Sequence, residues 1–375
     1  MNTVATVDMA PALELLAIAT LLAGSVLALW WWRMRRTTPA SRHVALAALA
    51  AFLTADLIVF GSFTRLTDSG LGCPDWPGCY GHASPLGASA AIASAEQVLP
   101  SGPVTVSKAW VEMIHRYLAM AVGALILVLN VVLWRARSAL PRRPWWAAVA
   151  LAWVLVQGLF GKYTVTLRLY PAVVTAHLLG GMVLLALLVA QLQSLQRSAP
   201  SSAARAATGV LALVALQIAL GGWVSSNYAV LACRGFPQCN GQWWPDADFA
   251  QGFRLLRELG RSAAEGYVEF EALVAIQLGH RIAALLVTVV VIALALRLWR
   301  DGPREDRRAA VWLLVLLAVQ LFSGMGNVLL DWPLLAALLH TAGAAALVAV
   351  LTSLACRREP ALAAQPLAGW QRHHV

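Results

Sequence analysis

The sequence predicts an all-α integral membrane protein built from two parallel-repeat four-helix bundles, with one extra N-terminal transmembrane helix. Three observations support this prediction. Hydrophobic residues make up 60% of the 375 residues and charged residues only 12%, and the mean hydropathy is +0.69, unlike a soluble domain. Apolar stretches of about 20 residues, long enough to cross a bilayer as a helix, recur along the chain. A set of cysteine, histidine, glutamine and glycine residues also occurs twice in the same order.

Nine apolar stretches are expected to span the membrane as helices, because backbone in lipid must satisfy its own hydrogen bonds. They cover residues 11–32, 43–63, 110–134, 145–166, 171–193, 206–225, 270–298, 309–330 and 333–356. Little more than Asp331-Trp332-Pro333 separates the last two, which predicts a tight turn whose proline begins the next helix. The loops at about 66–108 and 226–269 are the longest. The second is expected to form a surface helix over the bundle, on the apolar residues Phe249, Phe253, Leu255, Leu256 and Leu259.

Arginine residues set the expected orientation. Eighteen of them lie in alternate loops and the tail: Arg33, Arg35, Arg36, Arg42, Arg135, Arg137, Arg142, Arg143, Arg197, Arg205, Arg297, Arg300, Arg304, Arg307, Arg308, Arg357, Arg358 and Arg372. The other loops carry eight basic residues: Arg65, Lys108, Lys162, Arg168, Arg234, Arg254, Arg257 and Arg261. Because the arginine-rich side is cytoplasmic, we expect a multi-pass protein of the bacterial cytoplasmic (inner) membrane, with the N-terminus outward and the C-terminus in the cytoplasm.

The charge around the first segment agrees with this orientation. Asp8 and Glu14 precede the segment and an arginine cluster follows it, so a cleaved signal peptide is not expected. The net charge of +10 then reflects topology and attraction to anionic membrane lipid, and it does not indicate nucleic-acid binding.

Chemically distinctive residues occur twice, at an offset of about 160. The pairs are Cys73 and Cys233, Cys79 and Cys239, His115 and His280, Arg116 and Arg281, Gln157 and Gln320, Gly161 and Gly324, and His177 and His340. Each repeat holds four helices, so the two copies should share one orientation about an axis along the membrane normal. The expected divisions are 1–42 for the extra helix and a cytoplasmic loop, 43–193 for the N-terminal repeat, 194–205 for a cytoplasmic linker, 206–356 for the C-terminal repeat and 357–375 for a cytoplasmic tail.

The paired cysteines lie in loops that are expected to face outward, where an oxidising compartment permits the disulfides Cys73–Cys79 and Cys233–Cys239. A structural staple for each long loop is one interpretation, and closing such short loops restricts the unfolded chain by only a few kcal/mol. A role in passing electrons to the site is another. Metal binding is disfavoured, because neither pair has a histidine at zinc-ligand spacing. Cys356, at the cytoplasmic end of the last segment, is interpreted as an apolar filler.

Four of the eight histidines lie inside membrane segments: His115, His177, His280 and His340. One such histidine can be a packing residue, but four placed pairwise by a repeat predict metal ligands. Within each repeat the pair lies on the second and fourth helices, which can face each other across a bundle. Two imidazoles placed in this way can ligate one iron from both sides of a porphyrin. Zinc or copper sites usually gather more ligands, so the sequence favours heme.

The neighbours of these histidines point the same way. Arg116 and Arg281 directly follow the first histidine of each half, where a guanidinium can pair with a heme propionate. The alternative is snorkelling to the lipid headgroups. Three residues before the histidine the halves differ, with Glu112 in one and Gln277 in the other. Ionisable groups in the membrane are costly and usually functional, although an ion pair of Glu112 with Arg116 is an alternative. The difference predicts a reactive site in the N-terminal half and a structural or electron-transfer site in the C-terminal half.

Two motifs carry a resemblance to a known family. The stretch Gly61-Ser-Phe-Thr-Arg-Leu-Thr-Asp-Ser-Gly-Leu-Gly-Cys-Pro-Asp-Trp-Pro-Gly-Cys-Tyr-Gly81, followed by Glu112-Met-Ile-His-Arg-Tyr117, resembles heme A synthase, and the resemblance covers about 43–356. It implies an enzyme that oxidises the C8 methyl group of heme O to a formyl group by successive hydroxylations, for cytochrome oxidase biogenesis. It also implies a twofold-repeated eight-helix fold with a heme site in each half.

The same resemblance assigns roles to residues. It implies that His280 and His340 hold a resident heme b, that His115 and His177 flank the heme O substrate, and that Glu112 is the important acidic residue beside the substrate. The extra first helix departs from the family pattern, and paired cysteines in both halves match only part of the family. Implied partners are the heme O-forming protoheme farnesyltransferase and oxidase assembly factors in the same membrane. The electron donor and a possible homo-oligomeric state stay open.

Two other classes of protein are alternatives. A di-heme b-type electron-transfer protein would carry heme without altering it, and the difference between Glu112 and Gln277 favours the enzyme over it. A secondary transporter also suits parallel repeats. That class is expected to show broken helices and charged residues at mid-membrane, and the sequence is interpreted as having neither.

Overall fold

The computed structural model describes residues 10–196, 198–260 and 267–357. Within these residues the chain forms eleven α-helices, with isolated β-bridges as the only strand-like pairing. Nine of the described helices are long and apolar enough to cross a membrane. This confirms the prediction of an all-α integral membrane protein with nine spans. Asp8, Arg197, Arg261, Arg358 and Arg372, which entered the prediction of orientation, lie outside the described residues, as does the tail from residue 358.

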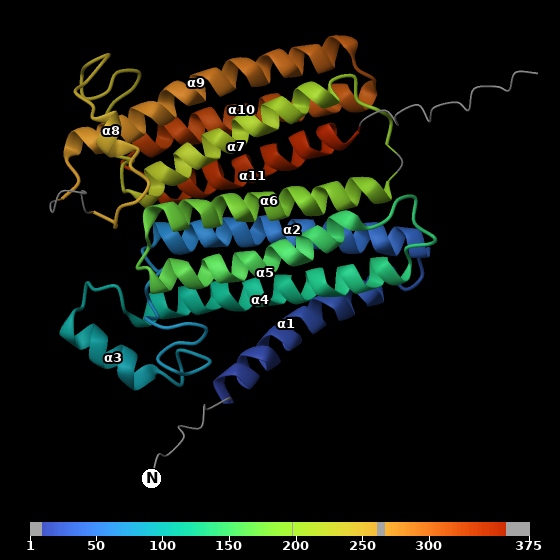
Figure 1. Ribbon diagram of the computed structural model, residues 1–375, viewed down its shortest axis with the longest axis horizontal. Helices are drawn as coiled ribbons and strands as arrows, with labels where there is room; N and C mark the ends of the chain where they lie inside the picture. Colours follow the sequence, from blue (N-terminus) through green and yellow to red (C-terminus); the bar gives the residue numbers. More distant parts are fainter. Residues whose placement is uncertain (1–9, 197, 261–266, 358–375) are drawn as a thin grey trace, which may run out of the picture.

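Eight of the spanning helices form two rings of four, which appear in Figure 1 as an upper and a lower group of helices. The first ring consists of α2 (Pro39–Leu66), α4 (Val106–Arg135), α5 (Trp145–Thr166) and α6 (Pro171–Leu195). The second consists of α7 (Ala204–Ser226), α9 (Phe270–Asp301), α10 (Arg304–Leu329) and α11 (Leu334–Cys356). In each ring every helix contacts the next, and the last closes on the first. The rings meet where α6 contacts α7 and α11, and where α2 contacts α11.

Residues related by the repeat touch each other between the two rings. The Arg65 guanidinium donates to the carbonyl of Ser225 at 2.6 Å, and the Tyr228 hydroxyl donates to Asp68 at 2.6 Å; both pairs are separated by 160 residues. A residue meets its own counterpart only near a twofold axis. These contacts therefore support the proposed division into two parallel repeats, with the pseudo-twofold axis passing between the ends of α2 and α7.

The ninth spanning helix, α1 (Ala10–Met34), lies outside this arrangement and contacts only α4 and α2 among the described helices. The peripheral position expected for the extra helix is confirmed.

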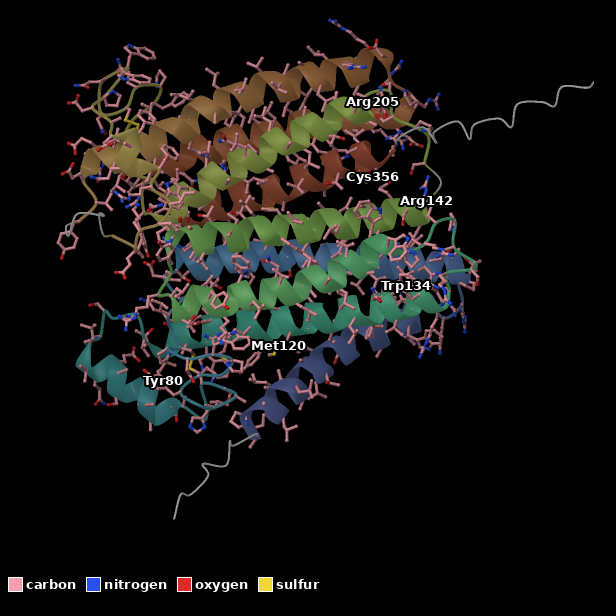
Figure 2. All side chains as sticks on the ribbon, viewed as in Figure 1. Tyr80, Met120, Trp134, Arg142, Arg205 and Cys356 are labelled. Atoms are coloured by element: carbon pink, nitrogen blue, oxygen red, sulfur yellow. A yellow bond between two sulfur atoms is a disulfide. The ribbon has the colours of Figure 1, made fainter. Side chains whose placement is uncertain are left out.

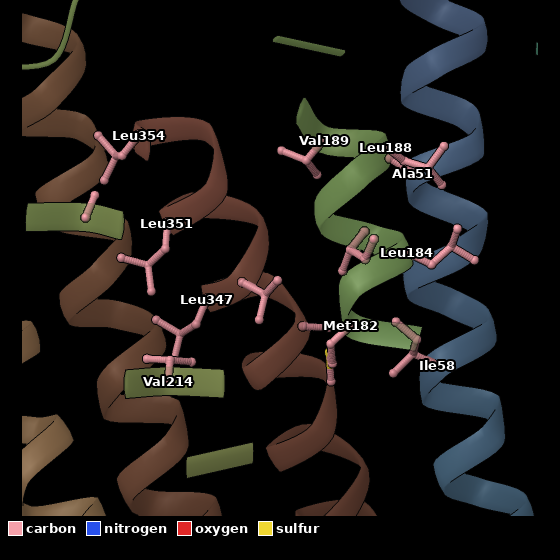
Figure 3. Close-up of a cluster of buried hydrophobic side chains, with 14 of the residues drawn as sticks. Ala51, Ile58, Met182, Leu184, Leu188, Val189, Val214, Leu347, Leu351 and Leu354 are labelled. Carbon is pink, nitrogen blue, oxygen red and sulfur yellow. The ribbon is translucent and has the colours of Figure 1, made fainter. Parts of the chain in front are cut away.

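Buried aliphatic side chains hold the two rings of helices together. Figure 3 shows Leu184 and Leu188 of α6 beside Ala51 and Ile58 of α2. Lipid tails are as apolar as leucine, so such helices associate through close packing rather than through hydrophobic burial.

Local sequence signals set the helix ends that matter for the site. The Thr105 side chain caps α4 by accepting a hydrogen bond from the backbone N–H of Lys108. α6 begins at Pro171, whose missing N–H costs nothing at a first helical position. The turn predicted between the last two spans is present: Asp331 and Trp332 have φ of 52° and 62°, in the left-handed region. Pro333 stands at the N-cap of α11, one residue before the position that the sequence suggested.

The two long loops lie at one end of the rings and the arginine-rich segments at the other. Figure 2 shows Tyr80 at the end that carries the loops and Arg142, Arg205 and Cys356 at the opposite end. This separation is the one that the positive-inside pattern requires. It supports the proposed orientation, with the loops outward and the arginines in the cytoplasm.

The surface helix expected in the second long loop is wrong in extent. Among the described residues of that loop only α8 (Phe249–Gly252) is helical, and the Trp223 indole N–H donates to the carbonyl of its last residue, Gly252, at 2.9 Å. Beyond it Leu255 and Leu256 are exposed. A longer surface helix that the sequence analysis did not anticipate, α3 (Ser89–Val98), lies in the first long loop, where alanines give it high helix propensity.

Candidate functional site

Each of the four intramembrane histidines lies against a glycine of a neighbouring helix. A Cβ atom added at the glycine would stand 3.0 to 3.6 Å from the imidazole Cε1 atom in the pairs Gly61 and His115, Gly161 and His177, Gly221 and His280, and Gly324 and His340. A larger side chain at these glycines would crowd the rings. The repeated glycines at 161 and 324 thus have a counterpart pair at 61 and 221, and each of the four imidazole rings lies against one glycine.

The positions of the four histidines within their helices place the four imidazole rings at one depth in the membrane span. His177 and His340 are each the seventh residue of their helix, while His115 and His280 are the tenth and eleventh. All four helices begin at the end that carries the long loops. Both histidine pairs therefore lie in the same third of the membrane span, close to the loops.

The pair in the second ring has the geometry of two ligands on one metal. The ring centroids of His280 and His340 lie 6.5 Å apart. Bonds of about 2 Å from two imidazoles to one metal between them put the centroids roughly 6 Å apart. The side-chain amide nitrogen of Gln217 lies 3.1 Å from Nδ1 of His280, and the Ser323 hydroxyl lies 3.0 Å from Nδ1 of His340. An imidazole that binds a metal through Nε2 donates its Nδ1–H to an acceptor. The Ser323 hydroxyl can accept that hydrogen as it stands, and the Gln217 amide can accept it after a rotation that brings its oxygen, which has no partner among the described residues, to Nδ1.

The pair in the first ring lacks this support. His115 and His177 are close enough to interact electrostatically. The Nδ1 atom of each ring is buried and has no hydrogen-bond partner among the described residues. The positions equivalent to Gln217 and Ser323 hold Leu57 and Phe160. Buried polar atoms are normally paired, so the imidazoles of the first pair are less constrained at Nδ1 than those of the second pair.

Glu112 is a buried carboxylate one turn before His115, with 3% of its surface exposed. One oxygen lies 2.5 Å from the Arg116 guanidinium and the other accepts the backbone N–H of Cys73 at 2.7 Å. Gln277, in the equivalent place, is also buried, and its carbonyl oxygen has no partner in the described part of the chain. The ion pair of Glu112 with Arg116, considered as an alternative, is present. The hydrogen bond from Cys73 joins the same carboxylate to the first long loop.

The two arginines after the histidines fasten the disulfide loops. Nη1 of Arg116 donates to the carbonyls of Asp75, Pro77 and Gly78. Arg281 donates to the carbonyls of Cys233, at 2.5 Å, and Gln238, at 3.3 Å. A contact of either arginine with a heme propionate stays a prediction. What these bonds add is rigidity, because each guanidinium ties its helix to the loop above it.

Both predicted disulfides are present, Cys73–Cys79 and Cys233–Cys239. In each loop the second cysteine forms a β-bridge three residues on, to His82 in the first loop and Gln242 in the second. The loops are therefore equivalent closed units. Among the described residues, only the first loop donates a hydrogen bond to a carboxylate one turn from an intramembrane histidine, through Cys73 and Glu112.

Sequence reasoning missed three polar residues near the site. Gln217 and Ser323 were not singled out, although aligning the repeats at offsets of 160 and 163 shows polar residues opposite Leu57 and Phe160. Asp56 was also missed, and the interpretation that no charge lies at mid-membrane is wrong. Asp56 belongs to α2 and lines a groove of about 240 Å³ between α2, α6 and α11. A lone aspartate in the apolar stretch 43–63 was the available signal.

Comparison with known proteins shows which proteins this chain is similar to. Residues 45–352 match the family model described as cytochrome oxidase assembly protein, COX15-CtaA. The chain is 37% identical to Heme A synthase of Shewanella oneidensis over 308 residues, which are 80% of this chain and 91% of that protein. It is 30% identical to Heme A synthase of Methylobacterium radiotolerans over 330 residues, 81% of this chain and 86% of that protein. It is 28% identical to Heme A synthase of Caulobacter vibrioides over 352 residues, 87% of this chain and 97% of that protein.

The matched region begins in α2 and ends in α11, so it contains both rings, all four histidines and both disulfide loops. It leaves out α1. On a family match over most of its length, the chain belongs to the cytochrome oxidase assembly proteins of the COX15-CtaA family.

Proposed function

We propose that this chain is a heme A synthase, a membrane oxidoreductase that converts heme O to heme A by oxidising the C8 methyl group to a formyl group for cytochrome oxidase biogenesis. Family membership supports the activity. One observation in the structure supports the assignment of the sites: the two histidine pairs are matched in position, but among the described residues only the second has side chains within hydrogen-bond distance of the Nδ1 atoms. That difference suits one heme that stays and one that is exchanged.

In this proposal the first ring binds the substrate. His115 and His177 would orient heme O from its two faces, and the apolar walls of the bundle would exclude water from the reacting methyl group. The iron supplies the redox chemistry of the hydroxylations. Glu112 is the proposed acid–base residue: the Arg116 guanidinium and the Cys73 N–H compensate its negative charge, and a proton released at the porphyrin edge has an acceptor there.

The second ring would hold the resident heme b. His280 and His340 are its proposed axial ligands, with Gln217 and Ser323 fixing the two rings. Arg116 and Arg281 are the proposed cations near the propionates of the two hemes. Their bonds to loop carbonyls hold the charges in place at the outer ends of α4 and α9.

The proposed setting is the bacterial cytoplasmic (inner) membrane, with the disulfide loops outward and the arginine-rich loops and the C-terminus in the cytoplasm. Heme O is hydrophobic and would come from the protoheme farnesyltransferase in the same bilayer, and heme A would pass to oxidase assembly factors. Oxidising a methyl group to a formyl group requires an oxidant, dioxygen in the case of a monooxygenase-type hydroxylation, and an electron donor outside this chain would then reduce that oxidant. A homo-oligomer is compatible with these assignments.

The proposal is tested by mass-resolved chromatography of hemes extracted from cells that make heme O, with and without this chain. We expect a new heme with the mass change of a methyl group converted to a formyl group. Heme O left unchanged beside b-type heme bound to the purified chain, with the donor supplied, would instead establish the di-heme electron-transfer protein. A chain that purifies without any heme would contradict both assignments.

Removing the first disulfide is expected to lower activity more than removing the second. In the variant with Cys73→Ser and Cys79→Ser, the loop that donates to Glu112 is no longer closed, and heme A formation should fall about tenfold. The matched variant with Cys233→Ser and Cys239→Ser should stay near the original activity. Both should lose stability by an amount on the order of 2 kcal/mol, since the loops have equal length. Heme A yield and thermal unfolding measure the two effects, and equal losses of activity would contradict the link to Glu112.

Gln217→Leu gives the second ring the residue that the first ring has at this position. The His280 ring then loses its side-chain contact at Nδ1, so we expect heme b to dissociate roughly tenfold faster, the lower end of the effect of removing such partners of ligating histidines. The measurement is the rate of heme transfer to an excess of apomyoglobin. The reciprocal change Leu57→Gln should slow the loss of heme from the first ring, and no change in either rate would show that these contacts do not hold the rings.

A further inference from the structure

Arg257, in the second long loop, is a buried cation without an anionic partner among the described residues. Only 4% of its surface is exposed. Its Nη2 atom donates to the side-chain oxygen of Asn227 at 2.7 Å, and its guanidinium carbon lies 5.8 Å from the centroid of the Trp223 indole. Its Nε atom is buried and has no hydrogen-bond partner. The described ion pairs all involve other arginines.

Such a charge is costly where it stands. Removing a cation from water costs several kcal/mol even after relaxation, and an amide oxygen and one aromatic face recover only part of that. Burial lowers the pKa of Arg257, and none of the ion pairs in the described part of the chain includes this arginine. The rest of the guanidinium fork is therefore suited to an anion that the chain itself does not supply.

The position of Arg257 connects it to the second ring. Gly221 of α7 lies against the His280 ring, and Trp223 follows two residues later. The Trp223 indole N–H holds the carbonyl of Gly252, and the Phe253 ring lies against Gly279, the residue before His280. The segment 249–257 is thus fixed to α7 and α9 over the outer end of the second ring.

The depth also fits. Asn227, the partner of Arg257, lies six residues beyond Gly221, which is about 9 Å farther outward at the rise of an α-helix. A porphyrin ligated by His280 and His340 has two propionates as its only peripheral anions. Directed outward, they avoid the apolar interior of the bundle. Arg257 is the buried cation at that outer end whose donors are not all engaged.

We propose that Arg257 binds a propionate of the heme held by His280 and His340, and thereby anchors that heme in the second ring. The inference rests on the proposed function only in that the second ring holds a heme. Arg116 and Arg281, which follow the histidines in the sequence, already donate to loop carbonyls. The proposal adds a third cation, which lies in the loop itself.

The two long loops differ in the way that this role requires. Residues 67–105 of the first loop contain no lysine or arginine at all, whereas the second loop contains Arg234, Arg254, Arg257 and Arg261. A loop-borne anchor would slow the release of a product from the first ring. In the second ring, where heme is proposed to stay, the same anchor adds retention. The distribution of loop cations thus follows the proposed division of labour.

The test compares heme b with its dimethyl ester, in which both propionates are neutral. Full-length protein stripped of heme is reconstituted with each, and the dissociation rate is measured for the original chain, for Arg257→Gln and for Arg254→Gln, an exposed arginine of the same loop. We expect the original chain and Arg254→Gln to lose the ester at least about tenfold faster than the free acid, since a charge-assisted hydrogen bond is lost. In Arg257→Gln that ratio should fall severalfold, leaving the part that Arg281 contributes, and the reduction potential of the bound heme should drop.

A structural role for Arg257 would give a different pattern. In that case Arg257→Gln would lower the melting temperature of the stripped protein and speed the loss of acid and ester equally. Our proposal expects the stripped variant to melt at the same or a higher temperature, because an unpaired buried charge has been removed. Should Arg257→Gln not fold, Arg257→Lys and the original chain still decide: no preference of the original chain for the acid would overturn the proposal.

One further control assigns the heme. In His340→Ala the preference for the acid over the ester should disappear, and its persistence there would place Arg257 at the first ring and overturn the assignment. Heme A formation is assayed separately. An acid-to-ester ratio that depends on Arg257 in a chain that forms no heme A would support the anchor while contradicting the proposed function.

Discussion

Glu112→Gln is expected to keep the resident heme and to lower the conversion of heme O at least about a hundredfold, the lower end of what a positioned acid–base group contributes. Glutamine has nearly the same shape and can still accept a hydrogen bond from Cys73 or Arg116, so the loop and α4 should stay in place. What it lacks is the negative charge and the capacity to take up a proton. The measurement is heme A formed per bound heme b in membranes from cells that make heme O.

The repeat supplies the matched control. Gln277→Glu places a carboxylate at the equivalent position of the second ring and should leave heme A formation unchanged, because the proposed substrate site is in the first ring. Full activity of Glu112→Gln would remove this carboxylate from the mechanism. A loss of bound heme b in that variant would show that Glu112 acts through the fold, and its effect on conversion would then say nothing about proton transfer.

The architecture was predictable because lipid restricts backbone so strongly. Nine apolar stretches could only be helices, and the arginine pattern separated the two ends before any packing was known. The histidine pairs were also predictable, since two imidazoles recurring at a fixed offset in apolar helices have few structural explanations. Apolarity and repetition are properties of the sequence itself, so both features needed no knowledge of contacts.

The loops and the neighbours of the ligands were not predictable in the same way. The segment after Phe249 has helical spacing, but the helix ends after one turn at Gly252, whose carbonyl accepts the Trp223 indole N–H. Arg257 reads as a surface charge until its burial is known. The engagement of Arg116 by three loop carbonyls depends on how a disulfide loop folds over a helix end. Tertiary contacts decide each of these cases, and local sequence carries little of that information.

Removing one ligand from each ring is expected to have unequal effects on bound heme. His340→Ala should lose the resident heme b, with its bis-histidine absorption spectrum, and all conversion of heme O with it. His177→Ala should keep that heme while forming no heme A. The reason is the unequal support of the two histidine pairs. Gln217 and Ser323 contact the imidazoles of the second helix ring, and the equivalent positions in the first helix ring are apolar. Heme per protein and the reduced-minus-oxidised spectrum of the purified chains give the answer.

The same two variants separate the enzyme from a di-heme electron-transfer protein. In such a protein both hemes are permanent, so either substitution would remove about half of the bound heme and leave a bis-histidine spectrum from the other ring. In the enzyme the content of tightly held heme depends on His340 and hardly on His177, because the first ring empties its product into the membrane. Symmetric losses would therefore contradict the division into a substrate ring and a resident ring, even though the fold treats the two rings as near copies. Unequal losses would show that the copies have diverged at the ligands' neighbours while the ligands themselves stayed the same.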